Sequence, residues 1–133
     1  MIELKNVSKA FGEKIIFSGC SLKFDSRPYC ITAASGTGKT TLLNLIAGTL
    51  APDGGEIIMN GINRVGMVWQ EDRLCENINA VKNVALVCGK ETPRAEIITL
   101  LEELGLKGSL DQPVSSLSGG QKRRTAIARA LIL

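Results

Sequence analysis

Apolar and polar residues alternate through the first 24 positions, as they do in strands that bury one face. Residues 2–7 follow this pattern loosely, whereas residues 20–24 follow it cleanly. Between them, a short apolar run at residues 15–17 ends at a break formed by Ser18 and Gly19. The pattern predicts an N-terminal group of antiparallel strands.

Two later segments, residues 29–33 and 65–69, are almost continuously apolar, which is typical of strands that are buried on both faces. Another strand is expected at residues 56–59, because turn-forming residues flank it at 52–55 and 60–61. The N-terminal half of the chain is therefore expected to be rich in strands.

Four segments are expected to be helical: residues 39–47, 80–87, 93–105 and 118–133. Gly48 is a stop signal for the first helix. Thr92 is expected to cap the third helix, with Pro93 as its first residue and Gly105 as its end. Ser118 opens the last helix. Strands followed by helices in this order predict an α/β fold.

The composition limits the classes of protein to which the chain can belong. Its 133 residues suit one globular domain, and 44% apolar with 22% charged residues exclude collagen-like, disordered and disulfide-scaffold proteins. The net charge of +3 is too small to predict nucleic-acid binding. No apolar run approaches the roughly 18 residues that span a bilayer, and the N-terminus lacks a signal-peptide core. We therefore expect a soluble domain.

The chain contains no histidine and four cysteines, which are Cys20, Cys30, Cys75 and Cys88. No two of these cysteines form a C-x-x-C pair, and no histidine is present to complete a zinc site with them. Reduced thiols in a cytosolic protein are expected. The absence of histidine also excludes every mechanism that uses an imidazole from this chain.

A glycine-rich loop at residues 33–41, the phosphate loop, lies between a predicted strand and a predicted helix. Gly36 and Gly38 allow the backbone to turn its N–H groups inward, and the positive end of the helix favours an anion. Lys39 would reach the β- and γ-phosphates of a nucleotide, and the Thr40 hydroxyl would ligate Mg²⁺. The loop is therefore predicted to bind a nucleotide.

The pattern G-x-x-x-x-G-K-[ST] is met except at its first position, where Ala33 stands in place of glycine. Alanine is comfortable there only with a negative φ, so we expect a slightly different entry into the loop. The alternative interpretation is a glycine-rich turn with an incidental lysine. The strand before the loop and the helix after it favour the nucleotide site, although kinases, GTPases and motor ATPases all share such a loop.

A second motif, LSGGQ at residues 117–121, precedes a basic segment. Ser118 and Gln121 satisfy the capping-box pattern without any ligand, and the basic residues would then form a solvated face. That interpretation does not explain Gly119 and Gly120, which cost a helix roughly 1 kcal/mol each. Glycines at a helix N-terminus leave N–H groups open to an anion that approaches closely.

With these motifs in order, the sequence resembles the nucleotide-binding subunits of ABC transporters over essentially its whole length. LSGGQ, followed by a basic helix that ends in Ala-Arg-Ala-Leu, looks like the signature motif of that family. Residues 7–12 are similar to the stretch whose aromatic residue stacks on adenine, which makes Phe11 the candidate. Residues 68–72 look like the Q-loop, in which Gln70 would contact Mg²⁺ or the attacking water. The alternatives are an ordinary buried Phe11 and a polar Gln70 at the end of a strand.

The resemblance implies ATP and Mg²⁺ as ligands and assigns site residues to them. The residues implied for ATP binding are Phe11, Ser35, Gly36, Thr37, Gly38, Lys39, Thr40 and Thr41. Gln70 would be catalytic, and Thr40 and Gln70 would ligate Mg²⁺. The residues implied to meet ATP across a dimer interface are Ser118, Gly119, Gly120 and Gln121.

The fold that the resemblance implies is α/β, with a P-loop NTPase (RecA-like) core, an N-terminal antiparallel β-subdomain and a helical subdomain. Residues 1–28 and 54–64 would form the β part, residues 29–53, 65–70 and 118–133 the core part, and residues 71–117 the helical subdomain. The Walker B strand, the catalytic glutamate and the switch histidine of the family lie beyond these motifs, so we expect a truncated domain that is inactive alone.

In the intact protein, the resemblance implies ATP hydrolysis that powers transport of a solute across a membrane. The expected partners are transmembrane permease subunits and a second ATPase subunit, arranged head to tail as a homodimer or a pair. A substrate-binding protein is a further candidate partner, and nucleic acid is not expected. The protein would lie peripherally on the cytoplasmic face of the cell membrane. Two alternatives remain open: a non-catalytic nucleotide-binding module, and a soluble ABC-type ATPase without a membrane partner.

Overall fold

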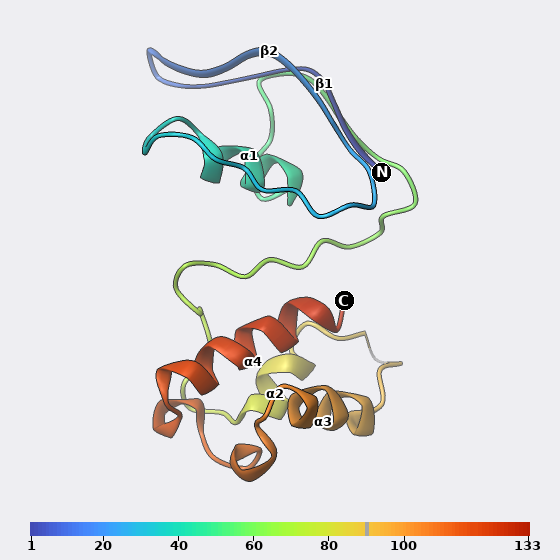
Figure 1. The fold of residues 1–133 in the computed structure, drawn as a ribbon, viewed down its shortest axis with the longest axis vertical. Coiled ribbons are helices and arrows are strands. Elements are labelled where there is room, and N and C mark those ends of the chain that lie inside the picture. Colours follow the sequence, from blue (N-terminus) through green and yellow to red (C-terminus); the bar gives the residue numbers. More distant parts are fainter. Residues whose placement is uncertain (90) are drawn as a thin grey trace. The chain divides into compact units, whose positions relative to one another are not determined.

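The computed structural model describes residues 1–89 and 91–133, which fold into two compact units. The first unit is Met1–Asn63 and the second is Arg64–Leu133. Figure 1 shows that strands belong to the first unit and that the second consists of helices and their connections. The α/β class predicted from the sequence is therefore confirmed. None of the helices in the described ranges is long and apolar enough to cross a membrane.

The first unit is built on a three-stranded antiparallel sheet with the order β2-β1-β3. Its strands are β1 (Ile2–Phe11), β2 (Lys14–Phe24) and β3 (Gly54–Met59). The predicted antiparallel group is confirmed, but the break expected at Ser18 and Gly19 is wrong, because β2 continues through it. Gly19 adopts a φ of 63°, and its N–H donates to Ser8 Oγ at 3.0 Å. A bulge of this kind absorbs one extra residue, so the strand bends without ending.

The core of the first unit lies between the sheet and helix α1 (Lys39–Ile46). Leu4 and Val7 of β1 pack with Leu42 and Leu45 of α1, and all four side chains are buried. The helix ends as predicted, because Gly48 follows it with a φ of 70°. This packing fixes the start of α1, and with it the phosphate loop, against the sheet.

The second unit is helical. It contains α2 (Ala80–Ala85), α3 (Arg94–Glu103) and α4 (Gly119–Leu131), with short 3₁₀ turns at Lys107–Ser109 and Val114–Ser116. The helix predicted at residues 80–87 ends earlier, because the N–H groups of Val87 and Cys88 bond to carbonyls three residues back and tighten the last turn. Pro93 rather than Thr92 is the N-cap of α3, because Pro93 itself has extended backbone, with φ −65° and ψ 138°, and the helix begins at Arg94.

The two strands predicted at residues 29–33 and 65–69 are wrong. In the part of the chain that the structure describes, neither segment pairs with another strand. Tyr29 instead sets its ring edge-on to Phe24, 5.1 Å between centroids, and remains 47% exposed. In the second segment, a Cβ on Gly66 would collide with the backbone of Ala130 in α4. Residues 29–33 are exposed. Continuous apolar character alone therefore did not predict these segments correctly, because a ladder requires a neighbouring strand as well.

Turn residues 52–55 also behave differently from the prediction, since Gly54 and Gly55 already belong to β3. Gly55 has a φ of 77°, and a Cβ there would collide with the backbone carbonyls of Lys5 and Asn6 on β1. Glycine is therefore required because the two strands approach closely at this point.

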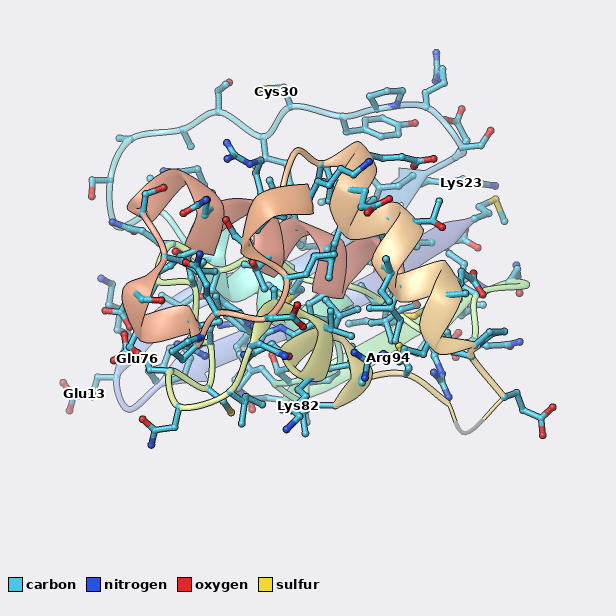
Figure 2. All side chains as sticks on the ribbon, turned by 90° about the horizontal axis from the view of Figure 1, so that it is seen from below. Glu13, Lys23, Cys30, Glu76, Lys82 and Arg94 are labelled. Atoms are coloured by element: carbon cyan, nitrogen blue, oxygen red, sulfur yellow. The ribbon has the colours of Figure 1, made fainter. Side chains whose placement is uncertain are left out.

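Asn83 is a fully buried polar residue that organises the segment before α2. Its Oδ1 accepts from the N–H of Cys75 at 2.8 Å, and its Nδ2 donates to the carbonyls of Cys75, Ile78 and Asn79 at 3.0–3.3 Å. The adjacent Lys82 is exposed and points away from the helix (Figure 2). One side chain thus satisfies the backbone groups of a whole turn.

We expect Asn83→Leu to lower the free energy of unfolding by about 3 kcal/mol, because it leaves several buried backbone groups without partners. Urea denaturation followed by circular dichroism measures this change. Asn63→Leu makes the same substitution at an exposed asparagine and should change stability by less than about 0.5 kcal/mol. Equal effects of the two variants would contradict this role of Asn83.

Candidate functional site

The phosphate loop enters α1 through two glycines with positive φ, 80° at Gly36 and 98° at Gly38. Gly38 is the N-cap, and a Cβ there would collide with the Ile16 side chain and lie 3.2 Å from the Phe17 ring. No side chain caps the helix, and its first turn contains no acidic residue. The positive end of α1 is therefore open to an anion.

A cavity of about 370 Å³ opens over this loop. Its lining residues come from the β1–β2 hairpin and the start of α1: Phe11, Lys14, Ile16, Ser35, Gly36, Gly38, Lys39, Thr40 and Thr41. The volume falls in the range of small-molecule sites, roughly 300–1,000 Å³. Two lysines and no acidic side chain line the cavity, so it favours an anionic ligand.

The cavity brings together most of the residues predicted to bind ATP in this unit. Phe11 is 51% exposed at the end of β1, so it is not the ordinary buried phenylalanine that the sequence left open. Thr37 is not among the lining residues; its Oγ1 donates to the Ala34 carbonyl at 2.8 Å and fixes the loop.

Lys39 is held at the beginning of the loop. Its Nζ donates to the carbonyls of Ala33 and Ala34 at 2.8 and 2.7 Å. Ala33 has no positive φ, so alanine is accommodated there without backbone strain. The ammonium group is thus oriented by the loop's own carbonyl groups.

Lys14 and Ile16 belong to the cavity but were missed from the sequence. Phe11 pairs with Lys14 across the β1–β2 hairpin, so the register places Lys14 beside the predicted aromatic residue. The signal that could have found Lys14 is this pairing, because Gly12 and Glu13 form a short connection between two alternating runs. Ile16 follows on the same face of β2.

The LSGGQ motif forms the start of α4 in the second unit, with the predicted capping box. Ser118 Oγ accepts from the Gln121 N–H at 3.3 Å, and Gln121 Oε1 accepts from the Ser118 N–H at 2.8 Å. Gln121 Nε2 also donates to Ser109 Oγ at 2.7 Å. Gly119 and Gly120 are exposed, and a Cβ on Gly119 would meet nothing within 4 Å. The cap explains Ser118 and Gln121, whereas the fold gives no reason for Gly119.

The basic residues of α4 are not simply a solvated face. Arg123 donates to the Trp69 carbonyl and, at 3.2 Å, to the Asp72 carboxylate. Arg129 donates to the backbone carbonyls of Arg73 and Asp72 at 2.7 and 3.0 Å. The two arginines therefore anchor the segment that follows Gln70 to α4, a role that spacing alone did not indicate.

Gln70 itself is exposed, between Trp69 and the anchored residues. Within the described residues, no group of three or more acidic, cysteine or histidine side chains could hold a metal ion. Of the two residues predicted to ligate Mg²⁺, Thr40 lines the cavity of the first unit, whereas Gln70 belongs to the second unit.

Comparisons with known proteins find a family model and similar sequences. Residues 24–133 match the family model described as ABC transporter. The chain is 40% identical over 148 residues to the spermidine/putrescine import ATP-binding protein PotA of Clostridium acetobutylicum, covering 99% of this chain and 42% of that protein. It is 36% identical over 137 residues to the aliphatic sulfonates import ATP-binding protein SsuB 1 of Mesorhizobium japonicum, covering 96% of this chain and 52% of that protein.

Among solved structures, the chain is similar to the ATP-binding cassette MJ0796 in a dimeric post-hydrolysis state bound to ADP and Pi. The two share 28% sequence identity with a TM-score of 0.78, over 99% of this chain and 69% of that one. The chain spans about half the length of the curated relatives it matches.

Proposed function

Because the chain belongs to the ABC transporter family, on the evidence of the family model and of relatives that are ATP-binding subunits, we propose that it binds ATP for an ATP-driven transporter. In the whole protein, hydrolysis of that ATP would power transport of a solute across a membrane. The observation that carries the proposal is the cavity over the phosphate loop, which combines an aromatic side chain, two lysines and the open end of α1.

Each part of the cavity has a proposed task in nucleotide binding. The backbone N–H groups of residues 35–41 and the Lys39 ammonium would hold the triphosphate, with Ser35 and Thr41 beside them. Phe11 would stack on the base, since its exposed ring lines the same cavity. The cavity thus combines positive charge with an exposed aromatic surface.

Thr40 and Gln70 would provide oxygen ligands for Mg²⁺. The chemistry that the ion would supply there is neutralisation of negative charge on the phosphate groups. Thr40 fits this task because its hydroxyl belongs to the second residue of α1 and lines the cavity. Gln70 is proposed to orient the attacking water, and Arg123 and Arg129 would hold its segment in place.

We assign the LSGGQ motif to a second site of contact with ATP. In a head-to-tail dimer, Ser118, Gly119 and Gly120 of one subunit would face the γ-phosphate bound by the other. The exposed glycines and the uncovered start of α4 support this assignment.

Transmembrane permease subunits are the proposed partners, and the protein would act at the cytoplasmic face of a membrane. The named relatives are ATP-binding proteins of spermidine/putrescine import and of aliphatic sulfonates import, so these relatives indicate no single transported solute.

The proposal is tested by titrating the chain with ATP in the presence of Mg²⁺ and in the presence of a chelator. Saturable binding that is tighter with Mg²⁺ is expected. Thr40→Val should lower the affinity for ATP with Mg²⁺ roughly tenfold, the equivalent of about 1.4 kcal/mol, and leave binding in the chelator unchanged.

The matched control is Thr49→Val, which makes the same change in the turn that follows α1. Thr49 Oγ1 donates to the Asn44 carbonyl at 3.2 Å and does not line the cavity. Its removal should leave both affinities unchanged. Absence of saturable ATP binding would overturn the proposed function, and full Mg²⁺ dependence in Thr40→Val would overturn the role of Thr40.

A further inference from the structure

Asp53, in the first unit, lies immediately before β3 and hydrogen-bonds to residues near the end of β1. Its N–H donates to the Ser8 carbonyl at 2.9 Å. Its two carboxylate oxygens accept from different groups, Oδ1 from Lys9 Nζ at 2.6 Å and Oδ2 from the Ala10 N–H at 2.8 Å. Asp53 therefore fixes both the backbone and a side chain immediately before Phe11.

Lys9 extends this arrangement to Phe11. Its Nζ lies 5.7 Å from the centroid of the Phe11 ring, within the range of a cation–π contact. The Lys9 side chain is only 12% exposed, while Phe11 is 51% exposed and lines the cavity. The Lys9 ammonium thus contacts both the Asp53 carboxylate and the Phe11 ring, and is not a free surface charge.

This ion pair differs from an ordinary surface pair on the same strands. Lys5 and Glu56 also join β1 to β3, but their charged atoms lie 3.7 Å apart and their side chains are 49% and 63% exposed. An exposed pair of that kind contributes little. The pKa of Asp53 is lowered, first by its hydrogen bond from Lys9 and then by that from Ala10.

We propose that Asp53 and Lys9 are positioning residues for the nucleotide base, and that they hold the exposed ring of Phe11 in the orientation in which it stacks. The inference rests on the proposed function, since it identifies the residues that orient Phe11 toward the base in the same site. A half-exposed ring at the end of a strand has several accessible orientations. Asp53 anchors Lys9, and Lys9 restrains the ring through a contact that leaves part of it open to the cavity.

A ligand that lacks a base isolates this effect. Inorganic tripolyphosphate presents the same phosphate chain as ATP but cannot use Phe11. The ratio of the affinities for ATP and tripolyphosphate therefore measures the base contact and is insensitive to a general loss of folded protein.

We expect Asp53→Asn and Lys9→Met each to lower ATP affinity roughly threefold to tenfold, the scale of one aromatic stacking contact. The affinity for tripolyphosphate should stay unchanged. Lys9→Arg retains a cation and should restore most of the ratio. Glu56→Gln, which breaks the other pair between the same strands, should leave both affinities unchanged.

A double-mutant cycle shows whether Asp53 acts through Phe11. In a Phe11→Ala background, Asp53→Asn should have no further effect on ATP affinity. An equal loss for ATP and tripolyphosphate, or an undiminished effect of Asp53→Asn without Phe11, would overturn the inference. If neither ligand binds the unsubstituted chain, the proposed function itself fails, and that result is distinct from intact binding with an unchanged ratio.

Discussion

Replacing Lys39 with alanine is expected to lower the affinity for ATP about 100-fold, since two charge-assisted hydrogen bonds to phosphate together contribute roughly 3 kcal/mol. Lys39 is the first residue of α1, and its side chain lines the cavity with the open helix end. The loss should be similar for ATP and for tripolyphosphate, because Lys39 would contact the phosphates only.

The fold should survive this substitution. The Lys39 ammonium bonds to the carbonyls of Ala33 and Ala34 in an exposed loop and does not enter the core cluster of the first unit. Lys23→Ala is the matched control, because Lys23 is exposed on β2 (Figure 2) and lies outside the cavity. Unchanged ATP affinity in Lys39→Ala, with the control also unchanged, would show that the phosphate loop does not hold the nucleotide.

Replacing Ser118 with arginine is expected to stop ATP turnover in the whole protein while ATP binding by one subunit is retained. Ser118 is exposed at the start of α4, in the second unit, and does not line the cavity. A long cationic side chain at this position would occupy the space in which the motif is proposed to meet the partner's nucleotide. Turnover should fall by about 100-fold or more, because the motif could then no longer reach the nucleotide whose transition state it is proposed to stabilise.

Ser118→Ala separates this effect from loss of the helix cap. Both variants remove the hydrogen bond from the Gln121 N–H, at a cost of roughly 1 kcal/mol of stability. Only arginine adds bulk and charge, so turnover should be much lower in Ser118→Arg than in Ser118→Ala. Equal turnover in the two variants would place Ser118 in a structural role alone.

The parts of the site predicted correctly were those in which local backbone chemistry determines the structure. Gly36 and Gly38 take the positive φ that the loop requires, and Ser118 with Gln121 forms the capping box. Such features depend on residues a few positions apart, so one sequence contains the information for them.

The features that were missed depend on residues far apart in the chain. The apolar runs at residues 29–33 and 65–69 predicted strands, but periodicity does not record whether a hydrogen-bonding neighbour exists. The run of basic residues predicted that Arg123 and Arg129 face solvent, yet they donate hydrogen bonds to backbone carbonyls more than 50 positions away in the chain. Asp53 likewise gave a turn signal while its carboxylate bonds to β1.

The most direct test of the central claim is to follow the backbone amide NMR signals of the chain while ATP and Mg²⁺ are added. We expect saturable shifts concentrated at residues 35–41 and at Phe11, and we expect Lys39→Ala to remove them at the same ATP concentration. No saturable shifts, or shifts confined to residues outside the cavity, would contradict the claim that the phosphate loop and Phe11 bind the nucleotide.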